Sequence, residues 1–305
     1  NMDNPKVREE IKDIMRFWLD MGVDGFREDV ITFISKAEGL PNGFPLPVAT
    51  GIEHYKSGPH LQEYLGEFRK VLDEYDCMTV GEAPMMTPKT AMKFIEENKD
   101  QKLNMMFHFQ HMEADCLFYS WIRAPFSLRK LKNVYNNWQT KLYGKAWNTL
   151  YIENHDQPRI CSSVERECDL VNYTAFLYFL KGTTLIYAGQ EFENSHLPSL
   201  FEREPIDRDT GRDMSALLAR LHGIKRRFGC ADYFVASADD EHNIAVLERG
   251  GDGKRFFGVF SLRSECAEVK IEAPDGEYEN LIDSSRVTVK DSRIRSDGRP
   301  IIFEA

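Results

Sequence analysis

The sequence predicts an α/β protein in which a parallel sheet covered by helices is followed by a small antiparallel β-sandwich. From residue 5 to about residue 228, helical and strand-like segments alternate, which is typical of parallel sheets with helical crossovers. After that point, short runs of period-two alternation are separated by Gly-, Asp- and Pro-rich turns, which indicates antiparallel strands. We therefore expect two domains, 1-228 and 229-305, as the length of 305 residues also suggests.

The first part begins with a helix over 5–20, because its apolar residues recur with a helical period and Asn4 before Pro5 is a suitable cap. Gly22 ends this helix, and a short strand follows over 23–30. A loop rich in Pro and Gly is expected over 37–59. Further helices are expected over 61–75, 88–98, 128–143, 171–180 and 214–227. Further strands are expected over 78–82, from about 103, over 147–154 and, as a short buried strand, over 185–189.

The second part carries the period-two runs of the predicted sandwich. They cover 243–247, 256–262, 267–272, 286–290 and 301–304. Turn signals at 250–253, 274–276 and 297–300 separate them.

Composition limits the classes of function. The net charge of −10 argues against nucleic acid or an anionic membrane surface as the main partner. No apolar run is long enough to span a bilayer, and residues 1–5 lack the features of a signal peptide. The six cysteines lack zinc-site spacing, so we expect reduced thiols in a cytoplasmic protein, with disulfides as the weaker alternative. We expect no metal ion and no cofactor.

The segment 24–30 carries the first candidate for chemistry. On a strand, Arg27 and Asp29 share one face while Glu28 points the other way. A cation beside a carboxylate favours the ionised form that a nucleophile needs. An ordinary ion pair at the end of a strand is the alternative interpretation.

Two more segments end predicted parallel strands with polar residues. Glu82 ends an apolar strand before Pro84, where partial desolvation raises the pKa of a carboxyl and keeps a proton available. Asn154, His155 and Asp156 crowd together after the strand over 147–154. Strand-to-helix loops at the carboxyl face of a barrel carry function. A surface glutamate and a loop hydrogen-bond network are the respective alternatives.

Together the three segments suit the cleavage of a glycosidic bond. One acid protonates the leaving oxygen while another attacks the anomeric carbon, and in a retaining enzyme the two carboxyl groups lie about 5–5.5 Å apart. Adjacent parallel strands, about 4.8 Å apart, can supply this spacing.

These segments resemble motifs of the alpha-amylase superfamily. The resemblance covers 25–30, 81–82 and 154–156, which are similar to its fourth-, fifth- and seventh-strand motifs. It implies Asp29 as the nucleophile, Glu82 as the general acid/base and Asp156 as the acid that grips the distorted sugar. It also implies that the chain is the C-terminal part of a TIM (β/α)8 barrel, about strands four to eight, followed by the β-sandwich.

Within that superfamily the chain is most similar to the oligo-1,6-glucosidase, dextran glucosidase and trehalose-6-phosphate hydrolase group. The resemblance implies that Arg27 orients the nucleophile, that His155 binds the same sugar and that Arg159 lines the entrance beyond the cleaved bond. Val30 is similar to the residue of members that prefer alpha-1,6 bonds. The implied activity is a retaining alpha-glucosidase acting on short alpha-1,6-linked glucose oligosaccharides.

Three features depart from the group's pattern. Glu28 stands where an apolar residue is usual, facing the helix layer, where a charge needs a partner. The segment 194–213 does not match the usual sequence of the last-strand loop in this group. It either shapes specificity or is a solvated loop, and we favour the solvated loop.

The group's barrel has three strands before the point where this sequence starts. A barrel with five of eight strands leaves open edges. We therefore expect the missing N-terminal half of the barrel as a partner, with weak or no activity alone.

Two other functions stay open. Trehalose-6-phosphate hydrolysis or sucrose isomerisation is chemistry of the same group, although no Lys/Arg cluster for a phosphate is evident. A non-catalytic amylase-like fragment is the remaining alternative, against which the three carboxylates argue.

Overall fold

The computed structural model describes residues 1–305 except 40, 47–48, 118–121, 165 and 230–232. The described chain divides into two compact units, one made of 1–110 with 145–149 and the other of 111–144 with 150–305. Among the described residues, no helix combines the length and the apolar character that crossing a bilayer requires.

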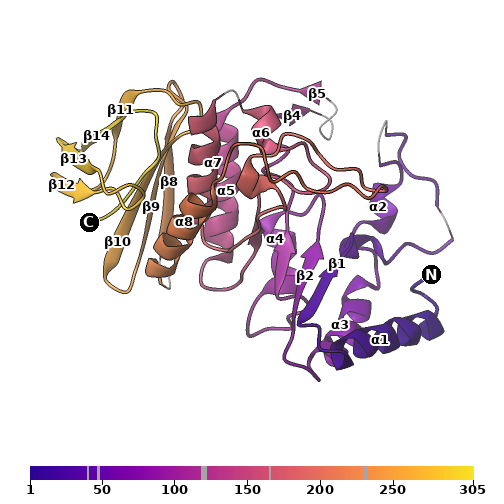
Figure 1. Cartoon of the computed structure of the whole chain (residues 1–305). Coiled ribbons are helices and arrows are strands. Elements are labelled where there is room, and N and C mark those ends of the chain that lie inside the picture. Colours follow the sequence, from indigo (N-terminus) through magenta and orange to yellow (C-terminus); the bar gives the residue numbers. More distant parts are fainter. Residues whose placement is uncertain (40, 47–48, 118–121, 165, 230–232) are drawn as a thin grey trace. The chain divides into compact units, whose positions relative to one another are not determined.

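The first unit contains three parallel strands and the helices that follow them (Figure 1). Strand β2 lies between β1 and β3, and Phe107 of β3 pairs with Thr149 of β6. The elements in chain order are α1 (Pro5–Asp20), β1 (Gly25–Glu28), η1 (Ile31–Phe33), α2 (Ile52–Tyr55), α3 (Leu61–Leu72), β2 (Met78–Glu82), α4 (Pro88–Ile95) and β3 (Met105–Phe107).

Local sequence explains where these elements begin. The Asn4 side chain accepts a hydrogen bond from the backbone amide of Lys6, and Pro5 occupies the first turn, so α1 starts at the predicted residue. Thr87 and Thr90 form a reciprocal capping box at the start of α4. Strand β2 has the predicted bounds. Its residues after Met78 are all buried, as expected for a strand inside a sheet that is covered on both faces.

The second unit holds the remaining helices and the sandwich. Its helices are α5 (Leu128–Leu142), α6 (Ile160–Ser163), α7 (Glu167–Phe179) and α8 (Ser215–Arg227), with η2 (Gln190–Phe192). Its first strands are β4 (Cys116–Leu117), β5 (Ile122–Arg123) and β7 (Thr183–Thr184), while β6 (Thr149–Leu150) spans the boundary between the units. The amide of Leu185 donates to the carbonyl of Leu150 at 2.8 Å, which joins the end of β7 to β6.

Two antiparallel four-stranded sheets form the predicted sandwich. One has the order β15-β10-β9-β8 and the other β11-β14-β13-β12. The strands are β8 (Tyr233–Asp239), β9 (Ile244–Gly251), β10 (Lys254–Ser261), β11 (Ala267–Lys270), β12 (Gly276–Glu279), β13 (Arg286–Lys290), β14 (Arg293–Ser296) and β15 (Ile301–Glu304). Alternate apolar residues of both sheets, among them Phe257, Ile294 and Phe303, form one buried cluster.

The first of these sheets also packs against helices. Phe176 and Phe179 of α7 meet Phe260 of β10 edge to face, each with ring centroids 5.7 Å apart. Leu221 of α8 belongs to the same buried cluster. Figure 1 shows α5, α7 and α8 alongside this sheet. One apolar core therefore joins residues on both sides of position 228, and a domain boundary there stays a prediction.

Several sequence expectations need correction. The strand expected over 185–189 is wrong, because β7 covers only Thr183–Thr184 and the next residues are half-buried. The loop expected over 37–59 contains the short helix α2, and its residues 40 and 47–48 lie outside the described part.

Four cysteines are free thiols, namely Cys77, Cys161, Cys168 and Cys266. Cys230 lies outside the described residues.

Candidate active site

The carboxyl ends of β1 and β2 bring Arg27, Asp29 and Glu82 together. Gly25 starts β1 with a φ of +144°, and a Cβ there would stand 1.8 Å from the carbonyl oxygen of Met78. Only glycine permits this close approach of β1 to β2. The register that follows pairs Arg27 with Val80, so the ends of both strands meet.

One guanidinium contacts both carboxylates. Nη1 of Arg27 donates to Oδ1 of Asp29, and Nη2 of Arg27 lies 3.0 Å from Oε2 of Glu82. The two acids are therefore neighbours at one edge of the sheet, as the sequence predicted. A positive charge at this distance favours the ionised form of a carboxyl group.

The two carboxylates differ in exposure. The side chain of Asp29 is 77% exposed, whereas that of Glu82 is 8% exposed. Oε2 of Glu82 also accepts a hydrogen bond of 2.9 Å from the amide of Val30, which adopts a left-handed conformation with φ 38°. This conformation is costly for a β-branched residue. It turns the chain after β1 and directs that amide at Glu82. An accessible acid beside a desolvated one matches the different tasks of a nucleophile and a proton donor.

Glu28 is the last residue of β1, between Arg27 and Asp29 in the chain, and its side chain is largely buried, as its strand parity predicted. Among the described residues, no group donates a hydrogen bond to its Oε2. Burial raises the pKa of Glu28 to about 7, and the positive charge of Arg69 on α3 opposes this rise. The sequence analysis expected a charged partner for Glu28. Arg69 attracts this carboxylate without forming an ion pair with it.

The third predicted segment belongs to the second unit. The amide of Asp156 donates to Oδ1 of Asn154 at 3.0 Å, which forms a turn. Nε2 of His155 lies 3.2 Å from Oδ2 of Asp156, and both side chains are partly exposed. The loop therefore presents a histidine and a carboxylate together, in a form that can contact a ligand.

Arg159 is held in a way that the sequence did not show. Its side chain is fully buried, and Nη1 donates to Oε1 of Glu153 at 2.6 Å. Nη2 donates to the carbonyl of Ala188 at 2.8 Å and Nε to that of His196 at 3.1 Å. In this structure the guanidinium fixes the loop around it, and substrate binding by Arg159 stays a prediction.

Glu153 is a site residue that the sequence analysis missed. It is buried, and its Oε2 accepts a hydrogen bond of 2.8 Å from the amide of Ile160. Burial raises the pKa of Glu153, while Ile160 and Arg159 oppose the rise. The available signal was an acid at the end of an apolar strand, directly before Asn154.

Within the described residues, no group of three His, Cys, Asp or Glu side chains is arranged to hold a metal ion.

Family models match nearly the whole chain. The model described as the alpha amylase catalytic domain matches residues 1–227, and the bacterial alpha amylase C-terminal domain matches residues 236–303. This chain belongs to the alpha-amylase family. The family's TIM barrel, with about its last five strands, and the C-terminal β domain are thus the fold that the sequence predicted.

Similar curated members of the family are named oligo-1,6-glucosidase or trehalose-6-phosphate hydrolase. An oligo-1,6-glucosidase of Parageobacillus thermoglucosidasius is 43% identical over 222 residues, which is 68% of this chain and 39% of that protein. One of Halalkalibacterium halodurans is 38% identical over 73% of this chain and 43% of its own length. A trehalose-6-phosphate hydrolase of Bacillus subtilis is 38% identical over 63% of this chain and 35% of its own. The chain spans about two fifths of the length of these relatives.

Solved structures agree on the fold. The trehalose-6-phosphate hydrolase of Bacillus licheniformis superimposes with a TM-score of 0.81 at 23% identity, covering 100% of this chain and 69% of that one. A trehalulose synthase mutant gives a TM-score of 0.82 at 21% identity, with the same coverage.

Proposed function

We propose that this chain carries the catalytic carboxylates of a retaining alpha-glucosidase that hydrolyses short alpha-1,6-linked glucose oligosaccharides. The observation that carries the proposal is the single Arg27 guanidinium shared by Asp29 and Glu82. It holds two acids of unequal exposure side by side, as a double-displacement reaction at one anomeric carbon needs.

The proposed reaction has two steps. In the first, the carboxylate of Asp29 attacks the anomeric carbon while Glu82 gives its proton to the leaving oxygen, which leaves a glucosyl ester on Asp29. In the second, Glu82 removes a proton from water while the water oxygen attacks the anomeric carbon. The bond to the Asp29 carboxylate breaks, and glucose leaves with the original anomeric configuration. Asp156 and His155 grip the hydroxyls of the distorted sugar, and Arg159 lines the entrance beyond the cleaved bond.

Substrate preference is proposed from the relatives and from Val30. The oligo-1,6-glucosidases are 38–43% identical to this chain. Val30 stands directly after the nucleophile, with its amide on Glu82, so its side chain is near the reacting bond. Initial rates of hydrolysis of isomaltose, maltose, sucrose and trehalose 6-phosphate test this preference. Isomaltose should be cleaved fastest. Faster cleavage of trehalose 6-phosphate, or isomerisation of sucrose, would contradict the proposal.

We further propose that activity needs the rest of the barrel. Strand β1 pairs with β2 on one side, and no described strand pairs with its other edge. Helix α1 and the C-cap residue Met21 expose large apolar side chains, with Ile14 51%, Phe17 58%, Trp18 46% and Met21 66% exposed. An open edge beside an apolar helix face is the surface that preceding strands and helices of a barrel would cover.

Mixing the chain with the N-terminal half of a related barrel tests this dependence. A chromogenic glucoside should be cleaved by the mixture and hardly by the chain alone. Full activity of the chain alone would refute this dependence.

We also propose a cytoplasmic location, with which the free thiols agree.

A further inference from the structure

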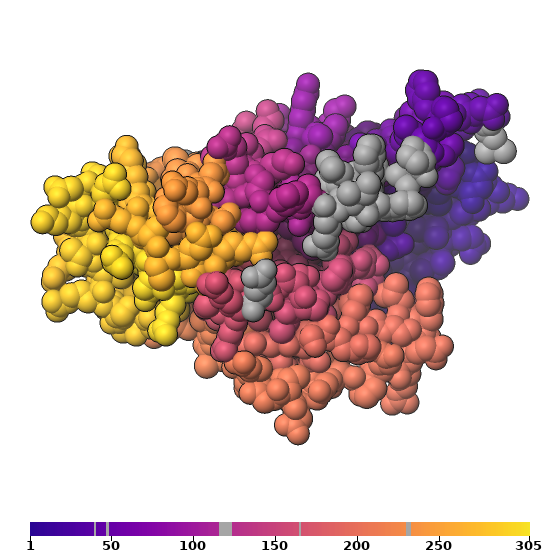
Figure 2. Space-filling view, turned by 90° about the horizontal axis from the view of Figure 1, so that it is seen from above, coloured from indigo at the N-terminus to yellow at the C-terminus, as the bar shows by residue number. Residues whose placement is uncertain are grey.

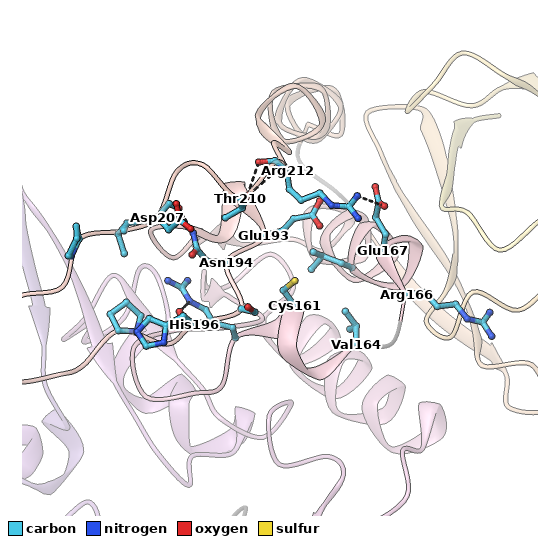
Figure 3. A pocket seen from close by; sticks show the side chains of 16 residues that line it. Cys161, Val164, Arg166, Glu167, Glu193, Asn194, His196, Asp207, Thr210 and Arg212 are labelled. Atoms are coloured by element: carbon cyan, nitrogen blue, oxygen red, sulfur yellow. Dashed lines mark hydrogen bonds and ion pairs between the residues drawn. The ribbon is translucent and has the colours of Figure 1, made fainter.

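The second unit contains a cavity of about 610 Å³, and Arg159 is the one residue of its described lining to which the proposed reaction gives a role. It is lined by described residues of 159–164, 166–170 and 193–212, and Asp29, Glu82 and Asp156 are not among them. Its volume falls in the range of small-molecule sites, about 300–1,000 Å³. Figure 3 shows Arg212, Glu193 and Glu167 near one another, with Asn194, Asp207 and His196 in another part of the lining.

Internal hydrogen bonds fix the wall formed by the segment 193–212. Nδ2 of Asn194 donates to the carbonyl of Asp207 at 2.6 Å. Oγ1 of Thr210 donates to the carbonyl of Phe192 at 2.6 Å. Buried Arg159 donates to the carbonyl of His196. Figure 2 shows the segment around residue 200 as a prominent part of the surface, and Phe201 is 92% exposed. The segment is therefore solvated at its tip and ordered where it faces the cavity.

Glu193 lines this cavity, and its backbone adopts a strained, left-handed conformation. It has a φ of 54°, which a residue other than glycine adopts at a cost. Burial raises the pKa of Glu193, and Arg212 opposes the rise. Within the described part of the chain, its carboxylate makes no hydrogen bond that would explain the strain. Strain of this kind is concentrated at ligand sites.

The charges around the cavity select the class of ligand. Arg212 is ion-paired with Glu167, and Arg159 is neutralised by Glu153. The other charged lining residues are Arg166, Glu193 and Asp207, so no surplus of positive charge remains for a phosphate or another anion. Acceptors beside donors instead suit hydroxyl groups, which both donate and accept. Apolar surface for sugar C–H faces comes from Val164, Leu170, Pro198, Pro205 and Ile206.

We propose that this cavity is a second carbohydrate-binding site, which takes a neutral, hydroxyl-rich sugar unit other than the one cleaved. The site binds through the acceptor of Glu193 and the donor of Arg212. The inference goes beyond the proposed function and does not rest on turnover, because binding here needs none of the catalytic carboxylates.

The thiol of Cys161 lines the cavity and reports on its occupancy. Burial raises the pKa of this thiol, so alkylation by iodoacetamide is followed at pH 8.5 by peptide mass spectrometry. Isomaltose and glucose are the probes, and the exposed Cys266 is the internal control. At a sugar concentration about twice the dissociation constant, alkylation of Cys161 should slow about threefold, because only the empty fraction reacts. Alkylation of Cys266 should not change.

Matched variants locate the protection. Glu193→Gln should lose it, whereas Glu202→Gln, a change at an exposed residue outside the lining, should keep it. The unchanged chain is also treated with glucose 6-phosphate, which should protect Cys161 less than glucose. Absence of protection by neutral sugars, equal protection in Glu193→Gln, or stronger protection by the phosphate would each overturn the proposal. Protection of Cys161, together with no hydrolysis by the mixture of the chain and the N-terminal half of a related barrel, would refute only the proposed function.

Discussion

Replacing Glu28 by glutamine should stabilise the protein, and more so as the pH rises. Glu28 is a buried acid whose pKa rises from 4.5 to about 7 on folding, because burial disfavours its charged form. Below pH 4.5 the carboxyl is neutral in both the folded and the unfolded chain, so it carries no penalty. Between pH 4.5 and 7 the unfolded chain ionises first, and stability is lost. Above pH 7 the loss is complete.

The magnitude follows from these two pKa values. At 1.36 kcal/mol per pH unit, the penalty on the free energy of unfolding is about 1.4 kcal/mol at pH 5.5 and about 3.3 kcal/mol at pH 8. Glutamine has nearly the same shape and no charge, so Glu28→Gln should recover most of this loss. The gain at pH 8 should exceed that at pH 5.5 by about 2 kcal/mol.

Urea unfolding followed by tryptophan fluorescence at the two pH values measures this difference. Glu10→Gln is the matched control, because Glu10 is exposed on α1. The control should change stability by less than about 0.5 kcal/mol at either pH. A gain for Glu28→Gln that is equal at pH 5.5 and 8, or a loss at pH 8, would refute the reasoning.

Three further substitutions test the site and its supports. Asp29→Asn in the active protein should lower kcat on the order of 10⁴-fold or more, with little change in the unfolding curve; substantial residual turnover would remove Asp29 as the nucleophile. Gly25→Ala should destabilise the chain by about 3 kcal/mol or more, since its Cβ meets the Met78 carbonyl; a neutral result in urea unfolding would contradict the close approach of the strands. Glu153→Ala should cost about 3–5 kcal/mol, because it leaves the buried guanidinium of Arg159 unpaired; thermal unfolding unchanged from the parent would show that the pair is not formed.

The sequence predicted best where one burial pattern was possible. Strand β2 is an apolar run between polar residues and has the predicted bounds, and β13 and β15 also do. The strands β8, β12 and β14 were missed. In β12 and β14, charged side chains alternate with few large apolar ones. The error at 185–189 has a different cause. An apolar run predicts burial, but it does not show whether a neighbouring strand continues beside it.

The candidate site was predicted in the same uneven way. Arg27, Asp29 and Glu82 could be found because strand parity and strand ends place side chains without knowledge of the loops. The ion pair of buried Arg159 with Glu153 could not be found, since it depends on the turn over 154–157 between them and on carbonyls from a distant segment. The left-handed Val30 was equally hidden, because a valine gives no signal for that conformation.

Trapping of the covalent intermediate tests the central claim most directly. The active protein is mixed with a slow fluorinated alpha-glucosyl fluoride, quenched and digested with trypsin, and the peptide covering residues 28–36 is sequenced by mass spectrometry. The proposed mechanism predicts one fluoroglucosyl group on Asp29, and no label in Asp29→Asn. Turnover of the reagent without a label on this peptide, or with a label on another carboxylate, would contradict the mechanism.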